Sequence, residues 1–314
     1  MTSETIENRI RKGTKIEGLF GMFDILGYKS LIKNDIDYCI DIYYNCIYNK
    51  HLAAIAFADS HTTDLQPSVQ PKLLAISDTF ILYHEYYPNE NNFEKLQRAS
   101  AFIISSCYLL RLAFEAGIPL RGAISFGEYY IDKENTIFLG RPIVEAHEIE
   151  VSQDWSGAIL CESAHNIIKP MFEDNNLESC ILEIKKNNDE CKTCNRTCLF
   201  DLNEYLVEYK IPYKEGTKKG LALRWDDFAV RDLFGIGLEN ININSSTGKT
   251  NKYNEIYINV EERFGAHKKD TNSKIKKKIE NTSIFFGYLN DIFSNQFIMK
   301  KFHRAYKPHK IKRD

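Results

Sequence analysis

Residues 18–26 (GLFGMFDIL) decide the fold, because this apolar and aromatic stretch is broken by a single carboxylate, Asp24. The pattern predicts a short buried strand, which Gly27 ends. An unpaired charge inside such a strand is costly. Asp24 therefore needs a cation, a network of hydrogen bonds or a position at the edge of the strand.

The elements that follow alternate between helix and strand. Apolar residues spaced by three and four predict a helix over residues 28–48. Two short apolar runs around Ser77-Asp78 predict a hairpin of strands Lys72–Ile76 and Thr79–Tyr83. Further along we expect a long helix, a strand, a second helix and a short strand, over residues 93–116, 120–130, 140–151 and 158–161.

This order of elements predicts an α+β sandwich, ferredoxin-like, with helices on one face of a mostly antiparallel sheet. We expect residues 1–17 to form an N-terminal arm and residues 18–170 the main domain. Residues 171–314 would be a C-terminal extension with a cysteine-rich insertion, helices over 273–293 and 297–306, and a basic tail.

Composition narrows the class of protein. The chain has 314 residues, 43% of them hydrophobic, and a net charge of −2. The hydrophobic content is sufficient for a buried core. The net charge does not indicate a strong attraction to nucleic acid or to an anionic membrane. No apolar run approaches the roughly 20 residues of a membrane span, and the start of the chain lacks the apolar stretch of a signal peptide. We expect a soluble, cytoplasmic protein.

Asp78, at the tip of the predicted hairpin, is a second carboxylate between apolar runs and, like Asp24, needs a cation, hydrogen bonds or an edge position. If the first strand and the hairpin are neighbours, the two carboxylates converge and form a site for a hard cation, Mg²⁺ or Mn²⁺. Gly27, directly before a helix, would let a phosphate approach backbone N–H groups. Metal and phosphate together indicate nucleoside triphosphate chemistry. The alternative is that Asp24 caps a helix and Asp78 is an ordinary turn residue.

Four short motifs in this order resemble the class III nucleotide cyclases, over about residues 18–165. The version of the last motif resembles most the pyrimidine cyclases of bacterial anti-phage (Pycsar) signalling. The motifs are residues 23–28 (FDILGY), Ser77-Asp78, residues 121–128 (RGAISFGE) and residues 139–150 (LGRPIVEAHEIE).

The resemblance implies a homodimer, arranged head to tail, with active sites at the interface. Asp24 and Asp78, with the backbone carbonyl of Ile25, would hold two divalent cations. One would activate the ribose 3′-hydroxyl for attack on the α-phosphorus, and the other would neutralise the triphosphate and the departing pyrophosphate. The phosphates would lie against Ile25, Leu26, Gly27 and Tyr28. The 3′,5′-cyclic product would act on a downstream effector.

Departures from the family pattern concern the base and the transition state. The two positions that read a purine in adenylate cyclases are Leu74, with Lys72 the nearest lysine, and Ile137. Neither side chain can hydrogen-bond a base edge, which favours a pyrimidine substrate, UTP or CTP. The usual Asn and transition-state Arg align with Val144 and Glu148.

Another cation must then stabilise the developing charge on the phosphate, and Arg121 and Arg141 are the candidates. For Arg121 the alternative is an ion pair with a helix carboxylate. For Arg141 it is a solvated surface position.

Four cysteines, Cys180, Cys191, Cys194 and Cys198, lie close enough in sequence to complete a tetrahedral structural zinc site. The alternative is a loop of reduced thiols. The other four are expected to be core thiols: Cys39, Cys46, Cys107 and Cys161.

The sequence therefore predicts a metal-dependent cyclase that makes cUMP or cCMP as a second messenger in phage defence. Three alternatives stay open. The first is an adenylate or guanylate cyclase with atypical base recognition. The second is a catalytically silent cyclase-like module that binds a nucleotide or a partner. The third is an interaction protein stabilised by zinc.

Overall fold

The computed structural model describes residues 13–34, 36–41, 43–44, 48–49, 71–86, 90, 92–132, 137–173, 205–225, 260–264 and 273–305. The strands are β1 (Thr14–Ile25), β2 (Lys72–Ile76), β3 (Thr79–Tyr83), β4 (Leu120–Asp132), β5 (Ile137–Gly140), β6 (Gly157–Leu160), β7 (Leu206–Tyr213) and β8 (Gly216–Leu223). The helices are α2 (Tyr28–Asn34), α3 (Ile36–Asp41), α5 (Asn92–Glu115), α6 (Arg141–Ser152), α7 (Glu162–Glu173) and α11 (Ser273–Ala305).

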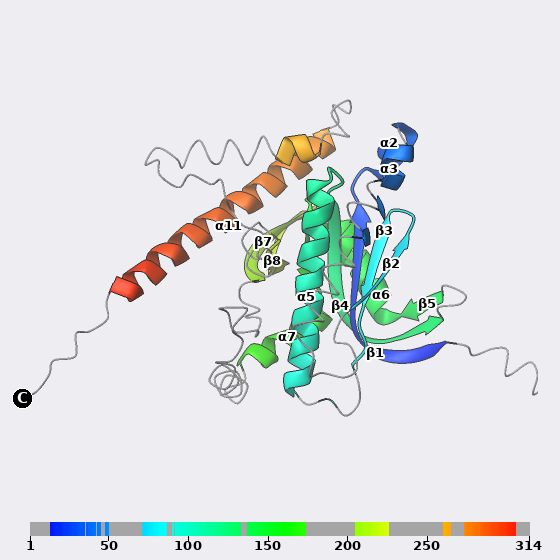
Figure 1. Cartoon of the computed structure of the whole chain (residues 1–314), viewed down its shortest axis with the longest axis horizontal. Helices are drawn as coiled ribbons and strands as arrows, with labels where there is room; N and C mark the ends of the chain where they lie inside the picture. Colours follow the sequence, from blue (N-terminus) through cyan, green and yellow to red (C-terminus); the bar gives the residue numbers. More distant parts are fainter. Residues whose placement is uncertain are drawn as a thin grey trace, which may run out of the picture.

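All eight strands form one sheet in the order β2-β3-β1-β4-β6-β8-β7, with β5 paired to β4 (Figure 1). Only β4 and β6 run parallel; every other pair of named strands is antiparallel. The expected α+β class with a mostly antiparallel sheet is confirmed. The sheet continues past residue 170, because β7 and β8 extend it through the pairing of β8 with β6.

Helices cover both faces of the sheet rather than the one face expected. Alternate residues of β1 enter two cores: Leu19 and Phe23 pack in the cluster that holds Phe102 of α5, and Phe20 packs in the cluster that holds Ala146 of α6. Figure 1 shows α5 in front of the sheet and α6 behind it. The even-numbered residues at the end of β1, Asp24 among them, therefore face the α6 side.

The hairpin β2–β3 has the bounds predicted from the sequence, whereas three other predictions differ from the structure. Residues 28–48 begin with two short helices, α2 and α3, in place of one long helix. Residues 273–305 form the single helix α11 where two were expected, since neither proline nor glycine interrupts the join. β1 also begins at Thr14, inside the predicted arm.

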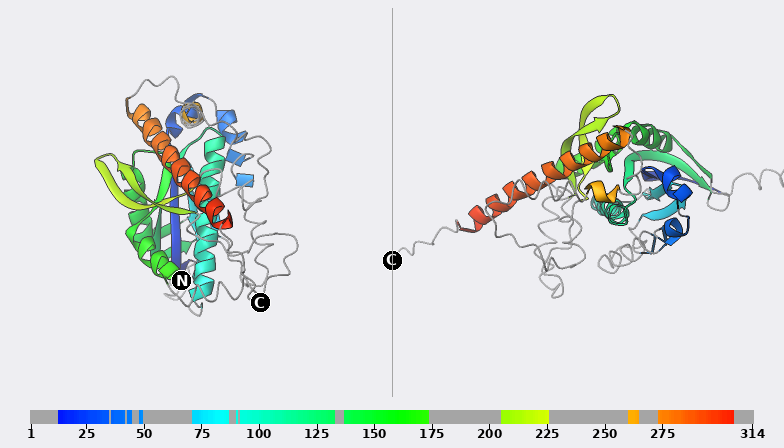
Figure 2. Two further views of the ribbon diagram at one scale, coloured as in Figure 1. Left: turned by 90° about the vertical axis from the view of Figure 1, so that its left-hand side faces the viewer. Right: turned by 90° about the horizontal axis from the view of Figure 1, so that it is seen from above.

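α11 begins beside the sheet and runs out past the body of the molecule (Figure 2). Near its start, Phe285 packs edge-on against Trp155, with ring centroids 4.6 Å apart. Trp155 is fully buried and donates its indole N–H to Gln153. No helix among the described residues is long and apolar enough to span a membrane.

Candidate active site at the end of β1

Asp24 lies at the C-terminal end of β1, where the strand leaves the core. It pairs with Thr79 of β3 on one side and with Arg121 of β4 on the other. The side chain is partly exposed, unlike those of its fully buried neighbours Phe23 and Phe20. Asp24 thus lies at the end of a central strand of the sheet, with a paired strand on each side, and its position at the end of the strand leaves its side chain partly exposed.

Asp78 is brought to the same place by the β2–β3 hairpin. The backbone N–H of Ile25, next to Asp24, donates a 2.8 Å hydrogen bond to the carbonyl oxygen of Asp78. The negative charge of Asp78 is also one of the causes that raise the pKa of Asp24. The structure therefore brings together the two carboxylates that the sequence singled out.

The turn that carries Asp78 has a strained backbone. Ser77 is the one non-glycine residue of the described chain with a positive φ, 55°. This left-handed conformation costs about 1–2 kcal/mol for a residue with a Cβ. Its carbonyl oxygen accepts a 2.9 Å hydrogen bond from the hydroxyl of Tyr43, whose ring stacks on Phe80. Such strain is often found at functional sites, where the surrounding structure maintains it.

The pKa of Asp24 is raised from 3.8 to about 7. Burial is the largest cause, followed by the negative charges of Glu150 and Asp78, while Arg121 and Lys278 oppose the shift. The charged carboxylate is therefore under-compensated by the chain itself. Two convergent carboxylates in this state form a donor set that suits a hard divalent cation.

Arg121 does not neutralise Asp24 directly. Its guanidinium group donates to Glu150 of α6 at 2.5 Å and to the carbonyl oxygen of Gln153 at 3.0 Å. Both charged side chains are buried, with 8% and 2% of their surfaces exposed. The ion pair with a helix carboxylate, one of the two alternatives for Arg121, is present.

The turn after β1 leads directly into α2. Gly27 has a φ of 75°, a conformation that favours glycine, and its carbonyl oxygen accepts a hydrogen bond from Leu31 at the start of the helix. The N–H of Leu26 donates to the carbonyl of Pro119. Ile25, Leu26, Gly27 and Tyr28 therefore follow Asp24 as a defined turn beside the carboxylates.

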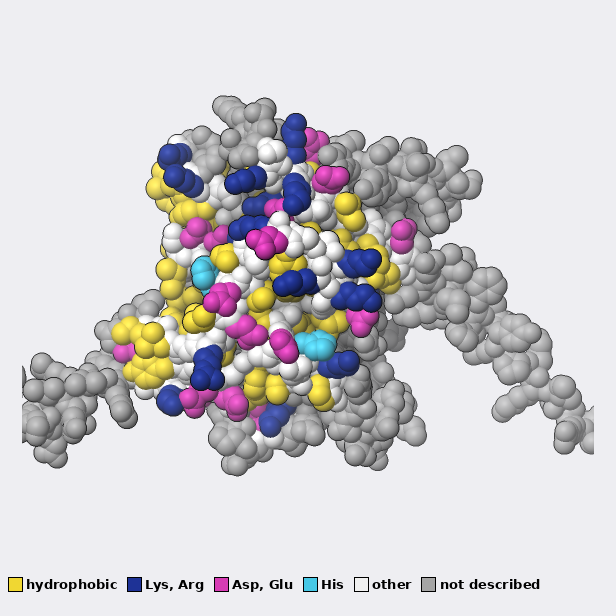
Figure 3. All heavy atoms as spheres, turned by 180° about the vertical axis from the view of Figure 1, so that it is seen from behind, with side chains coloured by type: hydrophobic (Ala, Val, Ile, Leu, Met, Phe, Trp, Pro, Cys, Tyr) yellow, Lys and Arg dark blue, Asp and Glu magenta, His cyan; other side chains and the backbone are white. Residues whose placement is uncertain are grey.

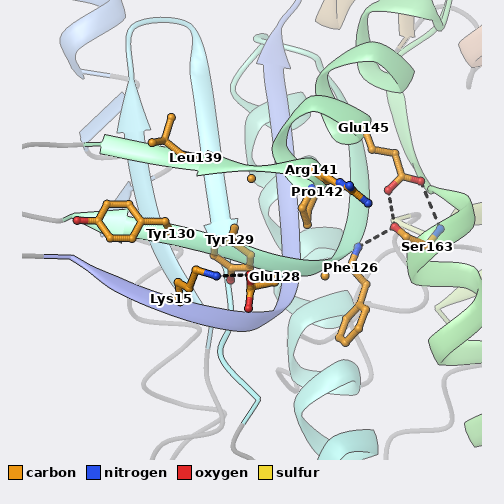
Figure 4. A pocket seen from close by; sticks show the side chains of 12 residues that line it. Lys15, Phe126, Glu128, Tyr129, Tyr130, Leu139, Arg141, Pro142, Glu145 and Ser163 are labelled. Carbon is orange, nitrogen blue, oxygen red and sulfur yellow. Dashed lines mark hydrogen bonds and ion pairs between the residues drawn. The ribbon is translucent and has the colours of Figure 1, made fainter. Parts of the chain in front are cut away.

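Arg141 lies far from this site within one chain. It begins α6 and lines a pocket of about 660 Å³ between the β4–β5 hairpin and the start of α6 (Figure 4). Gly140 pairs with Tyr129, eight residues along β4 from Arg121, or roughly 25 Å of extended strand. The pocket is thus at the other end of β4 from Asp24.

The positions expected to contact the base and the transition state are at or near the surface. Leu74 is half-buried on β2. Ile137 on β5 and Val144 on α6 are 41% and 57% exposed, and Glu148 is exposed on α6. Figure 3 shows the back of the molecule, where hydrophobic side chains lie among charged ones.

The proposed zinc ligands, Cys180, Cys191, Cys194 and Cys198, lie outside the described residues, as does Cys46. Cys39, Cys107 and Cys161 are buried free thiols, as predicted. No group of three or more His, Cys, Asp or Glu side chains suited to a metal ion is present in the described part of the chain.

Glu150 and Lys278 are two charged residues near Asp24 to which the sequence alone assigned no role. Glu150 stands in the quoted helix motif, and its position on the inner face of α6 was the available signal. Lys278 belongs to a run of lysines at the start of α11, and nothing in that run distinguishes it from its neighbours.

No protein-family model and no curated protein matches this chain. Solved structures with a similar arrangement include the catalytic core of a rhodopsin-guanylyl cyclase of converted specificity in complex with ATPαS, at 12% identity and a TM-score of 0.38 over 68% of this chain and 98% of that one. The guanylyl cyclase Cya2 is 10% identical, with a TM-score of 0.36, and the match covers 67% of this chain and 92% of that one. A class III adenylyl cyclase-like ATP-binding protein from Pseudomonas aeruginosa is 15% identical, with a TM-score of 0.35. This match covers 56% of this chain and 41% of that one.

Proposed function

We propose that this protein is a metal-dependent nucleotide cyclase, which converts a nucleoside triphosphate into its 3′,5′-cyclic monophosphate and pyrophosphate. The observation that carries the proposal is the meeting of Asp24 and Asp78 at the end of β1. The hydrogen bond from Ile25 to Asp78 and the raised pKa of Asp24 support it.

Asp24, Asp78 and the backbone carbonyl of Ile25 would hold Mg²⁺ or Mn²⁺. When bound, two such ions supply a Lewis acid that lowers the pKa of the ribose 3′-hydroxyl and neutralise the charge of the triphosphate. The chain itself orients the substrate. The turn of residues 25–28 would bind the phosphates, and the backbone hydrogen bond from Ile25 to Asp78 holds the backbone of Asp78 beside the end of β1.

A pyrimidine triphosphate, UTP or CTP, is the proposed substrate. Leu74 and Ile137 offer apolar side chains where a purine would require hydrogen-bonding groups. The role of the cyclic product as a second messenger in phage defence, acting on a downstream effector, follows from the resemblance of the motifs.

We infer a head-to-tail homodimer, because within one chain Arg141, the candidate transition-state cation, lies at the other end of β4 from Asp24 and Asp78. Arg141 lies roughly 25 Å along β4 from the carboxylates, while Ile137, Leu139 and Val144 expose apolar surface on the same part of the molecule. A second copy could bring these residues to Asp24 and Asp78.

The test is to incubate the purified full chain with ATP, GTP, CTP and UTP separately in Mn²⁺ and to measure 3′,5′-cyclic product. We expect turnover of one pyrimidine triphosphate, abolished by Asp24→Asn and by Asp78→Asn without loss of fold. A product from ATP or GTP alone would contradict the pyrimidine assignment. No product from any of the four would overturn the cyclase.

Glu148 favours one second candidate, a catalytically silent module that binds a nucleotide. An exposed carboxylate at this position repels phosphate where the family has an arginine. This candidate predicts binding of triphosphate in Mn²⁺ with no cyclic product.

A further inference from the structure

The first turns of α11 are bound to the segment that leads into β6. Asn281 donates to the carbonyl of Asp154 at 2.7 Å, and the N–H of Ser156 donates to the hydroxyl of Thr282 at 2.9 Å. Lys277 adds a 2.9 Å ion pair with the carboxylate of Asp154. Thr282 and Ser156 are fully buried. This part of α11 is therefore held in a defined position.

That segment adjoins the carboxylate site through the sheet. Gly157 pairs with Arg121, and Arg121 in turn pairs with Asp24. Neighbouring strands are about 4.8 Å apart. The docked turn of α11 thus lies at the same end of the sheet as Asp24, as Figures 1 and 2 also show for the start of α11.

Lys278 is the residue of that turn whose positive charge acts on Asp24. It lies one turn before Thr282, whose hydroxyl donates to the carbonyl of Lys278 at 2.7 Å. Its side chain is half-buried, and burial, aided by the charge of Arg121, lowers the pKa of its ammonium group. The charge of Lys278 acts in turn on Asp24.

The other charges around Lys278 are already matched or are solvated. Arg121 is bound to Glu150, and Lys277 is bound to Asp154. Lys214, whose charge also acts on Lys278, is exposed. Within the described part of the chain, the ammonium group of Lys278 has no hydrogen bond or direct ion pair. A half-buried cation without a direct partner is suited to an anion supplied from outside.

The surroundings also attract an anion. Lys274, Lys276 and Lys277 of α11 are exposed on the same stretch of helix. Figure 3 shows several Lys and Arg side chains gathered in the upper part of the back of the molecule, the end where α11 begins. Clustered cations raise the local concentration of a polyanionic ligand.

We propose that Lys278 of α11 is a substrate-binding residue, which contacts the phosphate groups of the triphosphate held beside Asp24 and Asp78. The proposal rests on the proposed function and deepens it. It supplies, from the same chain, a cation for the site in which position 148 carries glutamate in place of arginine.

The test compares Lys278→Met, Lys278→Arg and the matched surface control Lys276→Met in the full chain. Calorimetry would measure the Kd of inorganic triphosphate and of the α,β-methylene analogues of UTP and CTP, each with Mn²⁺, and of Mn²⁺ alone. We expect Lys278→Met to weaken triphosphate binding about tenfold or more, because a charge-assisted hydrogen bond is lost. Lys278→Arg should retain much of the affinity, and Lys276→Met should match the wild type.

Binding of Mn²⁺ alone separates this role from a structural one. Removing a neighbouring cation should leave the affinity for Mn²⁺ unchanged or increase it. Displacement of α11 would instead lower the affinities for both Mn²⁺ and triphosphate. Wild-type triphosphate affinity in Lys278→Met, or a parallel loss of Mn²⁺ affinity, would overturn the proposal and leave the cyclase standing. A wild type that binds triphosphate but yields no cyclic product overturns the cyclase alone. A wild type that binds no triphosphate overturns both.

Discussion

Asp24 and Arg121 are cross-strand partners on β1 and β4, yet the guanidinium group of Arg121 is bound to Glu150 of α6. The arginine therefore stabilises the packing of the helix on the sheet and only partly offsets the charge of Asp24. This arrangement keeps a carboxylate at the end of β1 whose charge the chain offsets only in part.

The stability of the protein should fall as the pH rises from about 4 to about 7. The pKa of Asp24 in the folded chain, about 7, lies above its ordinary value of 3.8, so the native state holds an extra proton between these values. Asp24→Asn should remove this dependence and raise the free energy of unfolding at pH 8 by up to about 2 kcal/mol, allowing for partial exposure. Urea unfolding at pH 5 and pH 8 measures both. An equal gain at the two pH values would contradict the assignment.

Affinity for Mn²⁺ should depend on pH in the opposite sense. A proton on Asp24 competes with the metal, so affinity should rise by up to about tenfold per pH unit below 7 and level off above it. Calorimetry from pH 5.5 to pH 8 would show this, with Asp24→Asn as the control that binds weakly throughout. A constant affinity over that range would exclude Asp24 as a ligand.

Glu150→Gln should destabilise the fold by about 3 kcal/mol, because it leaves the buried guanidinium of Arg121 without its counter-ion. The same change removes a negative charge that raises the pKa of Asp24, so that pKa should fall. Chemical denaturation and NMR titration measure the two effects. Glu148→Gln, on the exposed side of α6, is the matched control and should change stability by less than about 0.5 kcal/mol.

Ser77→Gly should stabilise the protein by about 1 kcal/mol, because glycine adopts the positive φ of this turn without strain. Ser77→Ala keeps the Cβ and should bring no such gain. Thermal unfolding distinguishes the two variants. If Ser77→Gly also lowers affinity for Mn²⁺, the stiffness of the turn contributes to the position of Asp78.

Mixing two inactive variants should restore activity if the site is shared between copies. Asp24→Asn lacks a metal ligand on one chain, and Arg141→Ala lacks the distant arginine, so a mixed dimer would contain one intact site. The measurement is cyclic product formed by the mixture compared with each variant alone. Persistent inactivity of a mixture shown to contain heterodimers would argue against a shared site.

The carboxylate pair could be predicted from the sequence because each aspartate interrupts a short apolar run. A charge inside an otherwise buried strand has few acceptable positions. Between two short apolar strands, Ser77-Asp78 can lie only in the turn that joins them. Periodicity gave the bounds of β2 and β3 for the same reason: the strands are short and the turn between them is tight.

The surroundings of the pair could not be predicted in this way. Arg121 and Glu150 meet because α6 crosses behind β4, and such a long-range contact leaves no local pattern. Lys278 is one of several similar lysines, and only the docking of α11 on Asp154 and Ser156 distinguishes it. The side of the sheet that α6 covers was also set by tertiary packing rather than by periodicity.

α11 is a continuous helix of 33 residues, which corresponds to a rod of about 50 Å. Its first turns pack beside the end of the sheet that carries Asp24, while its far end projects from the body of the molecule (Figure 2). A straight rod transmits rotation and translation along its whole length. A molecule that binds the projecting end of α11 would therefore shift the position of Lys278 at its other end.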